Sequence, residues 1–237
     1  MSQVNPASIV TLNGKVLETL RSDILSCRLK PNERLRTETL RMMYGAGTSP
    51  IREALMRLAA EGLVVLEQNK GFRVAGVSHE QLEDIMRTRA EIEILALRRA
   101  IEIGGVDWEA SVLGAFHRLS RQPKSDSERP EQINEAWKRE HKAFHDALVA
   151  ACQSPSLLSI RAGLFDQCDR YVALSVTAKT LPRDDVAEHE EIMKATIDRD
   201  AEKAERLLRK HIELTTEKVK LSNWFSDVPF EGEELPL

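Results

Sequence analysis

The stretch GTSPIREALMRLAAEG, residues 47–62, decides the fold of this chain because it contains a helix start, a helix stop and two distinct faces. Ser49 is a favoured N-cap residue, Pro50 suits the first helical position, and Gly62 can adopt the left-handed conformation that ends helices. These signals predict a helix over residues 50–61. On a helical wheel one side is apolar and consists of Ile51, Ala54, Leu55 and Leu58. The other side is more polar and consists of Ser49, Arg52, Glu53 and Met56.

A second short helix is predicted just before this one. Residues 35–44 have a helical composition, and Gly45-Ala46-Gly47 closes them. A helix, a glycine-containing turn and a helix form a helix-turn-helix, whose second helix enters the DNA major groove with its first residues. Thr48, Ser49 and Arg52 would then contact bases or phosphates. An ordinary helical hairpin has the same pattern, so this feature alone leaves both interpretations open.

Two strand-like segments follow the second helix. Residues 63–67 and 72–75 are rich in strand-forming residues, and Gln68-Asn69-Lys70-Gly71 joins them. A hairpin in this place is the wing of a winged helix. Its tip, Lys70 and Gly71, would lie near the DNA backbone or minor groove, where a glycine permits close approach.

These motifs resemble the winged-helix domain of GntR-type transcription regulators, over about Val10 to Val77. The resemblance rests on Ser49-Pro50-Ile51-Arg52-Glu53-Ala54-Leu55, Arg57-Leu58, Glu61-Gly62-Leu63-Val64 and Gly71-Phe72-Arg73-Val74. It implies a DNA-binding set of Thr48, Ser49, Arg52, Arg57, Lys70 and Gly71. The chain departs from the family pattern at Gly47-Thr48, where Ser-Arg is usual, and at Cys27 and Arg34, where glycines are usual. The change at Thr48 removes one expected DNA contact.

Composition and charge agree with a two-domain regulator. The 237 residues suffice for two domains, and no apolar run approaches the roughly 18 residues of a membrane span. The start lacks a signal-peptide layout, and the three cysteines show no CxxC spacing, so we expect reduced thiols in a cytoplasmic protein with no membrane partner. Up to Gly76 there are 11 basic against 7 acidic residues, and beyond it 23 against 31. A basic binding module on an acidic body has this asymmetry.

The sequence predicts helices almost throughout the second half of the chain. Helices are predicted over residues 79–103, 107–121, 131–152, 155–177, 184–199 and 200–221, separated by glycine and proline breaks. Six helices with short connections imply an antiparallel bundle. The predicted fold is therefore mainly α, with a winged helix-turn-helix at residues 1–76, a six-helix or larger bundle at 77–222, and an acidic tail at 223–237.

Four histidines fall on the predicted apolar faces of three of these helices. They are His141 and His145, four residues apart on one helix, and His189 and His211 on the last two helices. A single core histidine is usually bonded to a neighbour. Four together are satisfied at once by one divalent cation, and nitrogen-rich ligation suits zinc, or nickel, better than calcium or magnesium.

Two arginines also fall on apolar faces. Arg89 is four residues before Glu93, so an internal ion pair is one interpretation. The other is that its guanidinium binds the carboxylate of an effector, with Arg161 as a second candidate for the same task. His79 and His117 are expected at the surface or in packing.

The second half resembles FCD, the helical ligand-sensing domain of the FadR subfamily, and within it regulators of the CsiR type. The motifs are Arg89-Ala90-Glu91-Ile92-Glu93, His141-Lys142-Ala143-Phe144-His145, Glu188-His189-Glu190-Glu191-Ile192 and His211, with Trp108, Ala151-Cys152 and Arg170-Tyr171. The resemblance implies a divalent metal and a small carboxylic or dicarboxylic acid effector. Many metal-binding members have an aspartate as first ligand where His141 stands here. That change keeps a ligand and removes a negative charge.

Three functions are compatible with these features. The first is a homodimeric repressor that binds a two-fold symmetric operator and responds to an organic acid in a metal-containing bundle. The second is a metal-dependent, hydrolase-like enzyme fused to a DNA-binding module. The third is a structural helical adaptor. We predict the first, and no enzyme activity, because no nucleophile motif appears and no acidic residue is placed beside the four histidines as a general base.

Overall fold

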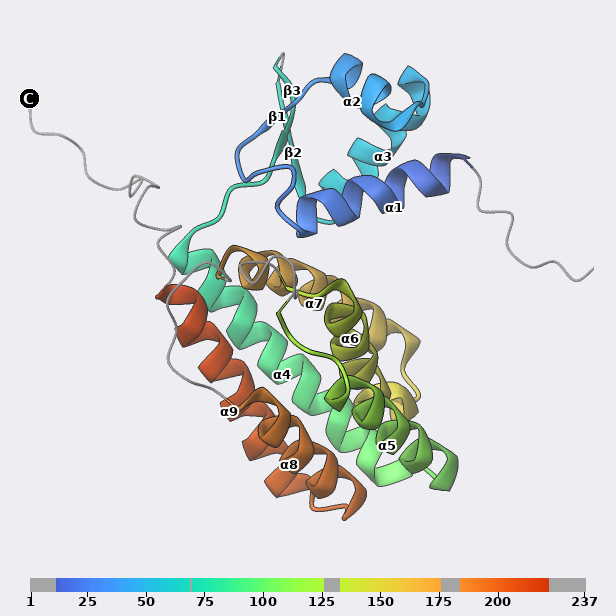
Figure 1. Ribbon diagram of the computed structural model, residues 1–237, viewed down its shortest axis with the longest axis vertical. Helices are drawn as coiled ribbons and strands as arrows, with labels where there is room; N and C mark the ends of the chain where they lie inside the picture. The colour runs from blue at the N-terminus through green and yellow to red at the C-terminus, as the bar shows by residue number, and fades with distance from the viewer. Residues whose placement is uncertain (1–11, 69, 126–132, 176–183, 222–237) are drawn as a thin grey trace, which may run out of the picture. The chain divides into compact units, whose positions relative to one another are not determined.

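The computed structural model describes residues 12–68, 70–125, 133–175 and 184–221 (Figure 1). Contacts divide the chain into two compact units, Met1–Val77 and Ser78–Leu237, each with its own core. The predicted acidic tail, and the residues between the predicted helices at 155–177 and 184–199, lie outside the described residues.

The first unit is a small helical domain with a three-stranded sheet. Its core combines residues from every helix and strand, including Leu20, Leu40, Leu55 and Phe72. The strands are antiparallel in the order β1-β3-β2, and Leu35 of β1 lies opposite Phe72 of β3. The elements are α1 (Leu12–Leu25), β1 (Arg34–Leu35), α2 (Thr37–Tyr44), α3 (Thr48–Ala60), β2 (Val64–Glu67) and β3 (Gly71–Val74). This is the predicted winged helix-turn-helix, and the fold class is confirmed.

Helix α3 begins two residues earlier than predicted. Gly47 occupies the N-cap position in an extended conformation and makes no side-chain cap, so the prediction of Ser49 as N-cap is wrong. The reason is the turn before the helix. Gly45 has a φ of +60° and Ala46 is buried, so the turn ends at Gly47, and Gly47 is the residue directly before the first helical position. Gly62 is left-handed as predicted, with a φ of +75°. The buried and exposed faces of α3 are those the wheel predicted.

Strand β1 was not predicted. The sequence placed Leu35 in the second helix, but Arg34 and Leu35 pair with Arg73 and Phe72. Helix α2 therefore starts at Thr37. The pairing holds the segment before α2 against the wing.

The second unit is a bundle built around α4, which packs against α6, α7 and α9 (Figure 1). Its helices are α4 (His79–Ile103), α5 (Val106–Ser120), α6 (Glu135–Val149), the short 3-10 helix η1 (Ala150–Cys152), α7 (Pro155–Ser175), α8 (Asp185–Ile197) and α9 (Ala201–Lys220). Ser78 caps α4 by accepting a hydrogen bond from the amide of Gln81. No described helix is long and apolar enough to cross a membrane, and none of the three cysteines forms a disulfide.

Most side chains on the predicted apolar faces are buried, with one clear exception. Val186 shares the predicted apolar face of the helix that carries His189, but it is 46% exposed because it lies in the first turn of α8. His117 is exposed, as expected for a surface residue.

The corner between α4 and α5 depends on Gly104. A Cβ at this position would lie 2.2 Å from a ring atom of Trp108 and 2.7 Å from the carbonyl oxygen of Ala100. The indole of Trp108 in turn donates a hydrogen bond to the carbonyl of Ala147, 2.8 Å away, which ties α5 to α6. Close contact between Gly104 and the indole thus helps to position the helix that carries two of the four histidines.

Candidate metal centre and nucleic-acid interface

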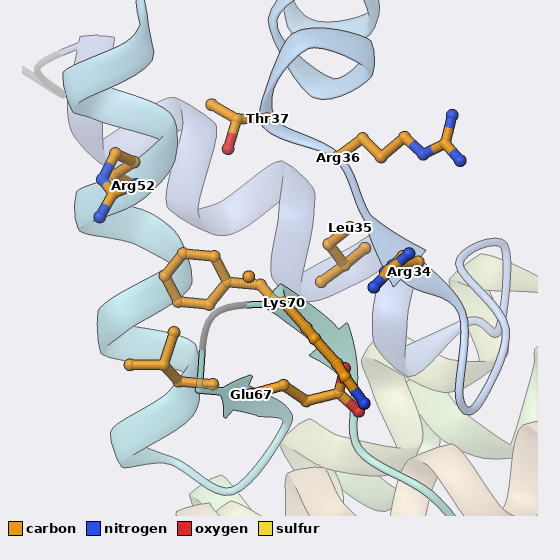
Figure 2. Close-up of a pocket in the computed structure, with 10 residues that line it drawn as sticks. Arg34, Leu35, Arg36, Thr37, Arg52, Glu67 and Lys70 are labelled. Carbon is orange, nitrogen blue, oxygen red and sulfur yellow. The ribbon is translucent and has the colours of Figure 1, made fainter.

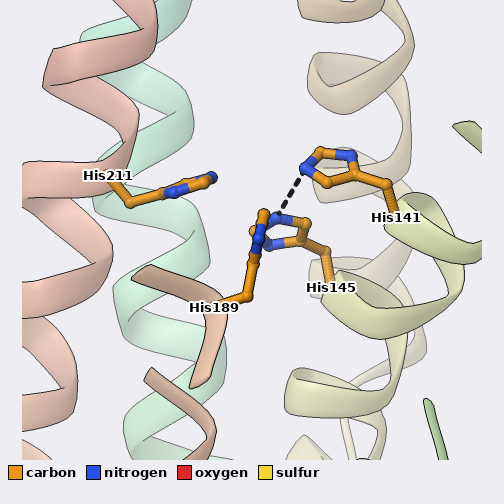
Figure 3. A group of neighbouring side chains, drawn as sticks. All are labelled: His141, His145, His189 and His211. Atoms are coloured by element: carbon orange, nitrogen blue, oxygen red, sulfur yellow. Dashed lines mark hydrogen bonds between the residues drawn. The ribbon is translucent and has the colours of Figure 1, made fainter. Parts of the chain in front are cut away.

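The structure brings the four predicted histidines together inside the second unit. His141 and His145 extend from α6, His189 from α8 and His211 from α9, and all four rings point toward one another (Figure 3). One ring nitrogen from each residue lies within 4.8 Å of all the others. Three of the residues are buried, and His141 is half-buried. We call this group the histidine cluster.

The hydrogen bonding of the histidine cluster is incomplete. Nε2 of His145 lies 3.2 Å from Nε2 of His141. Nδ1 of His145 and Nε2 of His189 are buried and have no hydrogen-bond partner among the described residues. A buried polar nitrogen without a partner costs about 1–3 kcal/mol. A metal ion accepts such lone pairs, so the residues present fit a divalent cation.

Burial also keeps the imidazoles in the form that binds metals. It holds the pKa values of His141, His145 and His189 well below the usual range for histidine, and the neighbouring imidazoles lower them further. Neutral imidazole offers a free lone pair, whereas imidazolium does not. Neutral nitrogen ligands from three helices are a donor set that suits zinc or nickel.

Two outer contacts orient the rings of the histidine cluster. The carboxylate of Glu188 lies 2.9 Å from Nδ1 of His211, so Nδ1 carries the proton and Nε2 is left with its lone pair. The indole of Trp137 stacks on His141, with ring centroids 4.5 Å apart and 16° between the planes. The ammonium group of Lys124 lies over Trp137, 4.8 Å from the ring centroid.

Glu188 was not predicted from the sequence as a partner of the histidines. Glu188 precedes His189, but its partner is His211 on the next helix, and no local spacing reveals that pairing. Trp137 was not predicted as part of the site either. Its position four residues before His141 was the available signal, since side chains at that spacing meet on a helix.

Arg89 and Arg161 share one buried carboxylate. Nε of Arg89 lies 3.3 Å from one oxygen of Glu93, and Nε of Arg161 lies 2.8 Å from the other. Arg161 also pairs with Asp146. The internal ion pair considered from the sequence is therefore present, with Arg161 as an unforeseen third member. One nitrogen of Arg161, Nη2, is buried without a hydrogen-bond partner in the described part of the chain.

Phe165 links this ion-pair network to the histidine cluster. The guanidinium carbons of Arg89 and Arg161 lie 4.4 Å and 5.4 Å from the centroid of its ring. The same ring lies 6.0 Å from His141 and 5.8 Å from His145, measured between centroids. The guanidinium groups of Arg89 and Arg161 and the imidazoles of His141 and His145 thus all lie near one aromatic residue.

In the first unit, a hollow of about 560 Å³ lies between α3, the segment before α2 and the wing (Figure 2). Three of the predicted DNA-binding residues, Arg52, Lys70 and Gly71, line it. Thr48 and Ser49 are exposed in the first turn of α3. The structure does not bring Arg57 to this hollow: its guanidinium pairs with Glu53, 2.7 Å away. We call the hollow the basic groove.

A winged helix with a basic groove, followed by a helical unit with a buried ligand-type cluster, defines the class of two-domain DNA-binding transcription regulators. Residues 12–74 match the model for bacterial regulatory proteins of the gntR family, and residues 84–214 match the model for the FCD domain. The chain belongs to the GntR family and carries an FCD domain.

Individual relatives agree with that assignment. The chain is 37% identical over 209 residues to the HTH-type transcriptional repressor GlaR of Escherichia coli strain K12, covering 86% of this chain and 93% of GlaR. It is 32% identical over 219 residues to the HTH-type transcriptional regulator BphR of Paraburkholderia xenovorans strain LB400, covering 92% and 89%. These relatives are transcription regulators, and the chain is a DNA-binding regulator rather than an enzyme.

Solved structures share the fold. The structure of Escherichia coli McbR/YncC superimposes with a TM-score of 0.75 at 23% sequence identity, over 90% of this chain and 98% of that one. A GntR-type putative regulator from Rhodococcus sp. RHA1 superimposes with a TM-score of 0.70 at 18% identity, over 88% and 97%. At these identities the similarity concerns the fold alone.

Proposed function

We propose that this regulator is a repressor whose FCD domain holds a divalent metal, zinc or nickel, and senses a small carboxylic or dicarboxylic acid. The observation that carries the proposal is the convergence of four imidazoles, three of them buried, with ring nitrogens that lack hydrogen-bond partners in the described chain. His141, His145, His189 and His211 would hold the metal, which would supply a Lewis-acidic site for an oxygen ligand.

The shared carboxylate of Glu93 supports the acid-binding part of the proposal. Glu93 has two arginine partners, and its contact with Arg89 is the longer one. Arg89 can therefore exchange Glu93 for an incoming carboxylate while Arg161 keeps Glu93 paired. An uncompensated buried charge, which costs several kcal/mol, does not arise in that exchange.

Binding of the acid has to change DNA affinity for the protein to act as a sensor. This requires that the acid bind with different affinity to the DNA-competent and the incompetent arrangement. We propose a homodimer, because a two-fold operator matches two winged helices, and release from DNA when the acid binds.

Elemental analysis of the purified protein tests the metal site. We expect stoichiometric zinc or nickel in the wild type, and loss of most of it in His145→Ala. His117→Ala is a matched control, because His117 is exposed and outside the histidine cluster. Full metal occupancy in His145→Ala, or none in the wild type after growth and purification with added zinc or nickel, would contradict the proposal.

A thermal-shift screen of dicarboxylic and hydroxy acids on the metal-loaded protein tests the effector site. We expect a stabilising acid to lose its effect in Arg89→Met, which removes the guanidinium and keeps most of the side-chain volume. The folded fraction is measured in parallel by circular dichroism. If Arg89→Met is unfolded, Arg89→Lys is used, and an unchanged acid response in the folded variant would show that Arg89 only pairs internally.

A further inference from the structure

The arginines of the first unit fall into two groups. Five of them pair with carboxylates: Arg21 with Glu61, Arg28 with Asp23, Arg41 with Glu38, Arg57 with Glu53, and Arg73 with Glu67. The other three, Arg34, Arg36 and Arg52, have no ion pair within the described residues, and all three line the basic groove. Arg34 and Arg36 were not predicted as DNA-binding residues. Both nevertheless lie in the basic groove beside Arg52, which was predicted to bind DNA.

Three separate elements bring these cations to one place. Arg34 lies on β1, whose pairing with β3 holds it next to the wing. Arg36 is the N-cap residue of α2 and has an extended backbone, and Arg52 lies on α3. Figure 2 shows Arg52 on one side of the groove and Arg34 and Arg36 on the other. Lys70, from the tip of the wing, adds a fourth cation.

The groove contains little negative charge to balance these side chains. Its one acidic lining residue is Glu67, which binds Arg73 at 2.8 Å. The four cations and the hydroxyl of Thr37, at the first residue of α2, are donors that an extended polyanion can satisfy. The start of α2 faces the same space and also favours negative charge.

We infer that one sugar–phosphate strand of bound DNA runs through the basic groove, held by Arg34 and Arg36. In a winged helix the first residues of α3 enter the major groove, and the wing lies near the neighbouring minor groove. The strand that separates those two grooves must pass between the two elements, which is where the basic groove lies. Guanidinium groups bind phosphate in bidentate fashion, so Arg34 and Arg36 position the protein, and Arg52 contacts bases. This inference rests on DNA binding by the family and adds two residues to it.

The salt dependence of DNA binding tests the inference. The probes are a duplex selected from a random library by the wild-type protein and a scrambled duplex of the same length. The logarithm of the DNA-binding constant falls linearly with the logarithm of the salt concentration, and each lost phosphate contact reduces the magnitude of that slope by about 0.9. For Arg34→Ala/Arg36→Ala we expect a slope reduced by about 2 and weaker binding of both duplexes by the same factor, so the ratio of their affinities is unchanged.

Arg28→Ala is the matched control, because Arg28 is on the same unit, 73% exposed and outside the groove. It should bind both duplexes like the wild type. Arg34→Lys/Arg36→Lys keeps both charges and should recover most of the slope, and circular dichroism checks that each variant is folded. A wild-type slope in the double alanine variant overturns the inference, and so does a changed affinity ratio at an unchanged slope. If the wild type itself binds neither duplex, DNA binding by this chain fails as well.

Discussion

Replacing Glu188 with glutamine removes the negative charge beside His211 and leaves the size of the side chain unchanged. In the structure one oxygen of Glu188 lies 2.9 Å from Nδ1 of His211, and both side chains are largely buried, at 21% and 7% exposed. The carboxylate can only accept, which fixes the proton on Nδ1 and directs the Nε2 lone pair to the histidine cluster. A glutamine amide can present either its oxygen or its nitrogen to that ring. The variant therefore weakens the control of the tautomer and lowers the basicity of the ring.

The expected magnitude follows from the role of such outer contacts. Their removal typically lowers metal affinity by about 10- to 100-fold, which corresponds to roughly 1.4–2.7 kcal/mol of binding free energy. For a protein of this size, each kcal/mol changes the melting temperature by about 2–4 °C. The stabilisation by saturating zinc should thus fall by roughly 3–11 °C in Glu188→Gln.

Competition with a chromophoric chelator measures the zinc affinity, and thermal denaturation with and without zinc measures the stabilisation. Glu190→Gln is the control, because Glu190 lies on the same helix and pairs with Lys194 at the surface. The metal-free melting temperatures report any general damage to the fold. Equal zinc affinity in Glu188→Gln and the wild type, with the fold intact, would refute the argument that Glu188 orients a ligand.

Three further predictions concern the DNA interface, pH and packing. Arg52→Ala should weaken binding to the selected duplex by about 1–3 kcal/mol and reduce its preference over a scrambled duplex, as measured by fluorescence anisotropy; an unchanged preference would remove Arg52 from base contact. The metal-free protein should lose stability as the pH falls below about 6.5, because the unfolded chain takes up protons on the three imidazoles whose pKa values burial depresses in the folded state. Urea denaturation in the presence of a chelator, between about pH 5 and 8, measures the free energy of unfolding. We expect this free energy to change with pH by up to about 1.4 kcal/mol per pH unit for each of the three imidazoles, and a free energy that does not depend on pH would count against their burial. Gly104→Ala should destabilise the protein by about 1–3 kcal/mol through its clash with Trp108, whereas Gly105→Ala, with open space at its Cβ position, should cost less; equal urea midpoints would contradict this account.

The elements with strong local signals were predicted closely from the sequence. Helix α4 runs from His79 to Ile103 as predicted, because Ser78 caps its start and Gly104 follows its end. The start of α3 was misplaced because cap preference favours Ser49, whereas the tight turn before the helix assigns the cap to Gly47. Strand β1 has two residues, too few for an alternating pattern, and it depends on a pairing with β3 almost 40 positions later.

The candidate sites were predictable only in part, and for a similar reason. His141 and His145 share a helix face at a spacing of four, so the sequence alone could suggest their contact. The contact between Arg161 and Glu93 joins residues 68 positions apart. Arg36 was assigned to the helix predicted at residues 35–44, and Arg34 was noted only as a departure from the family pattern. The pairing of β1 with the wing brings both residues to the basic groove.

The uninterrupted course of α4 has a mechanical consequence for signalling. The helix starts at the boundary between the two units, and Arg89 lies about three turns, roughly 15 Å, along it. Over that length a helix bends little, so under the proposed function a displacement of Arg89 by a bound acid would be transmitted along α4 to its first residues. We therefore expect α4 to move as one rigid helix from Arg89 to its N-cap residue, Ser78.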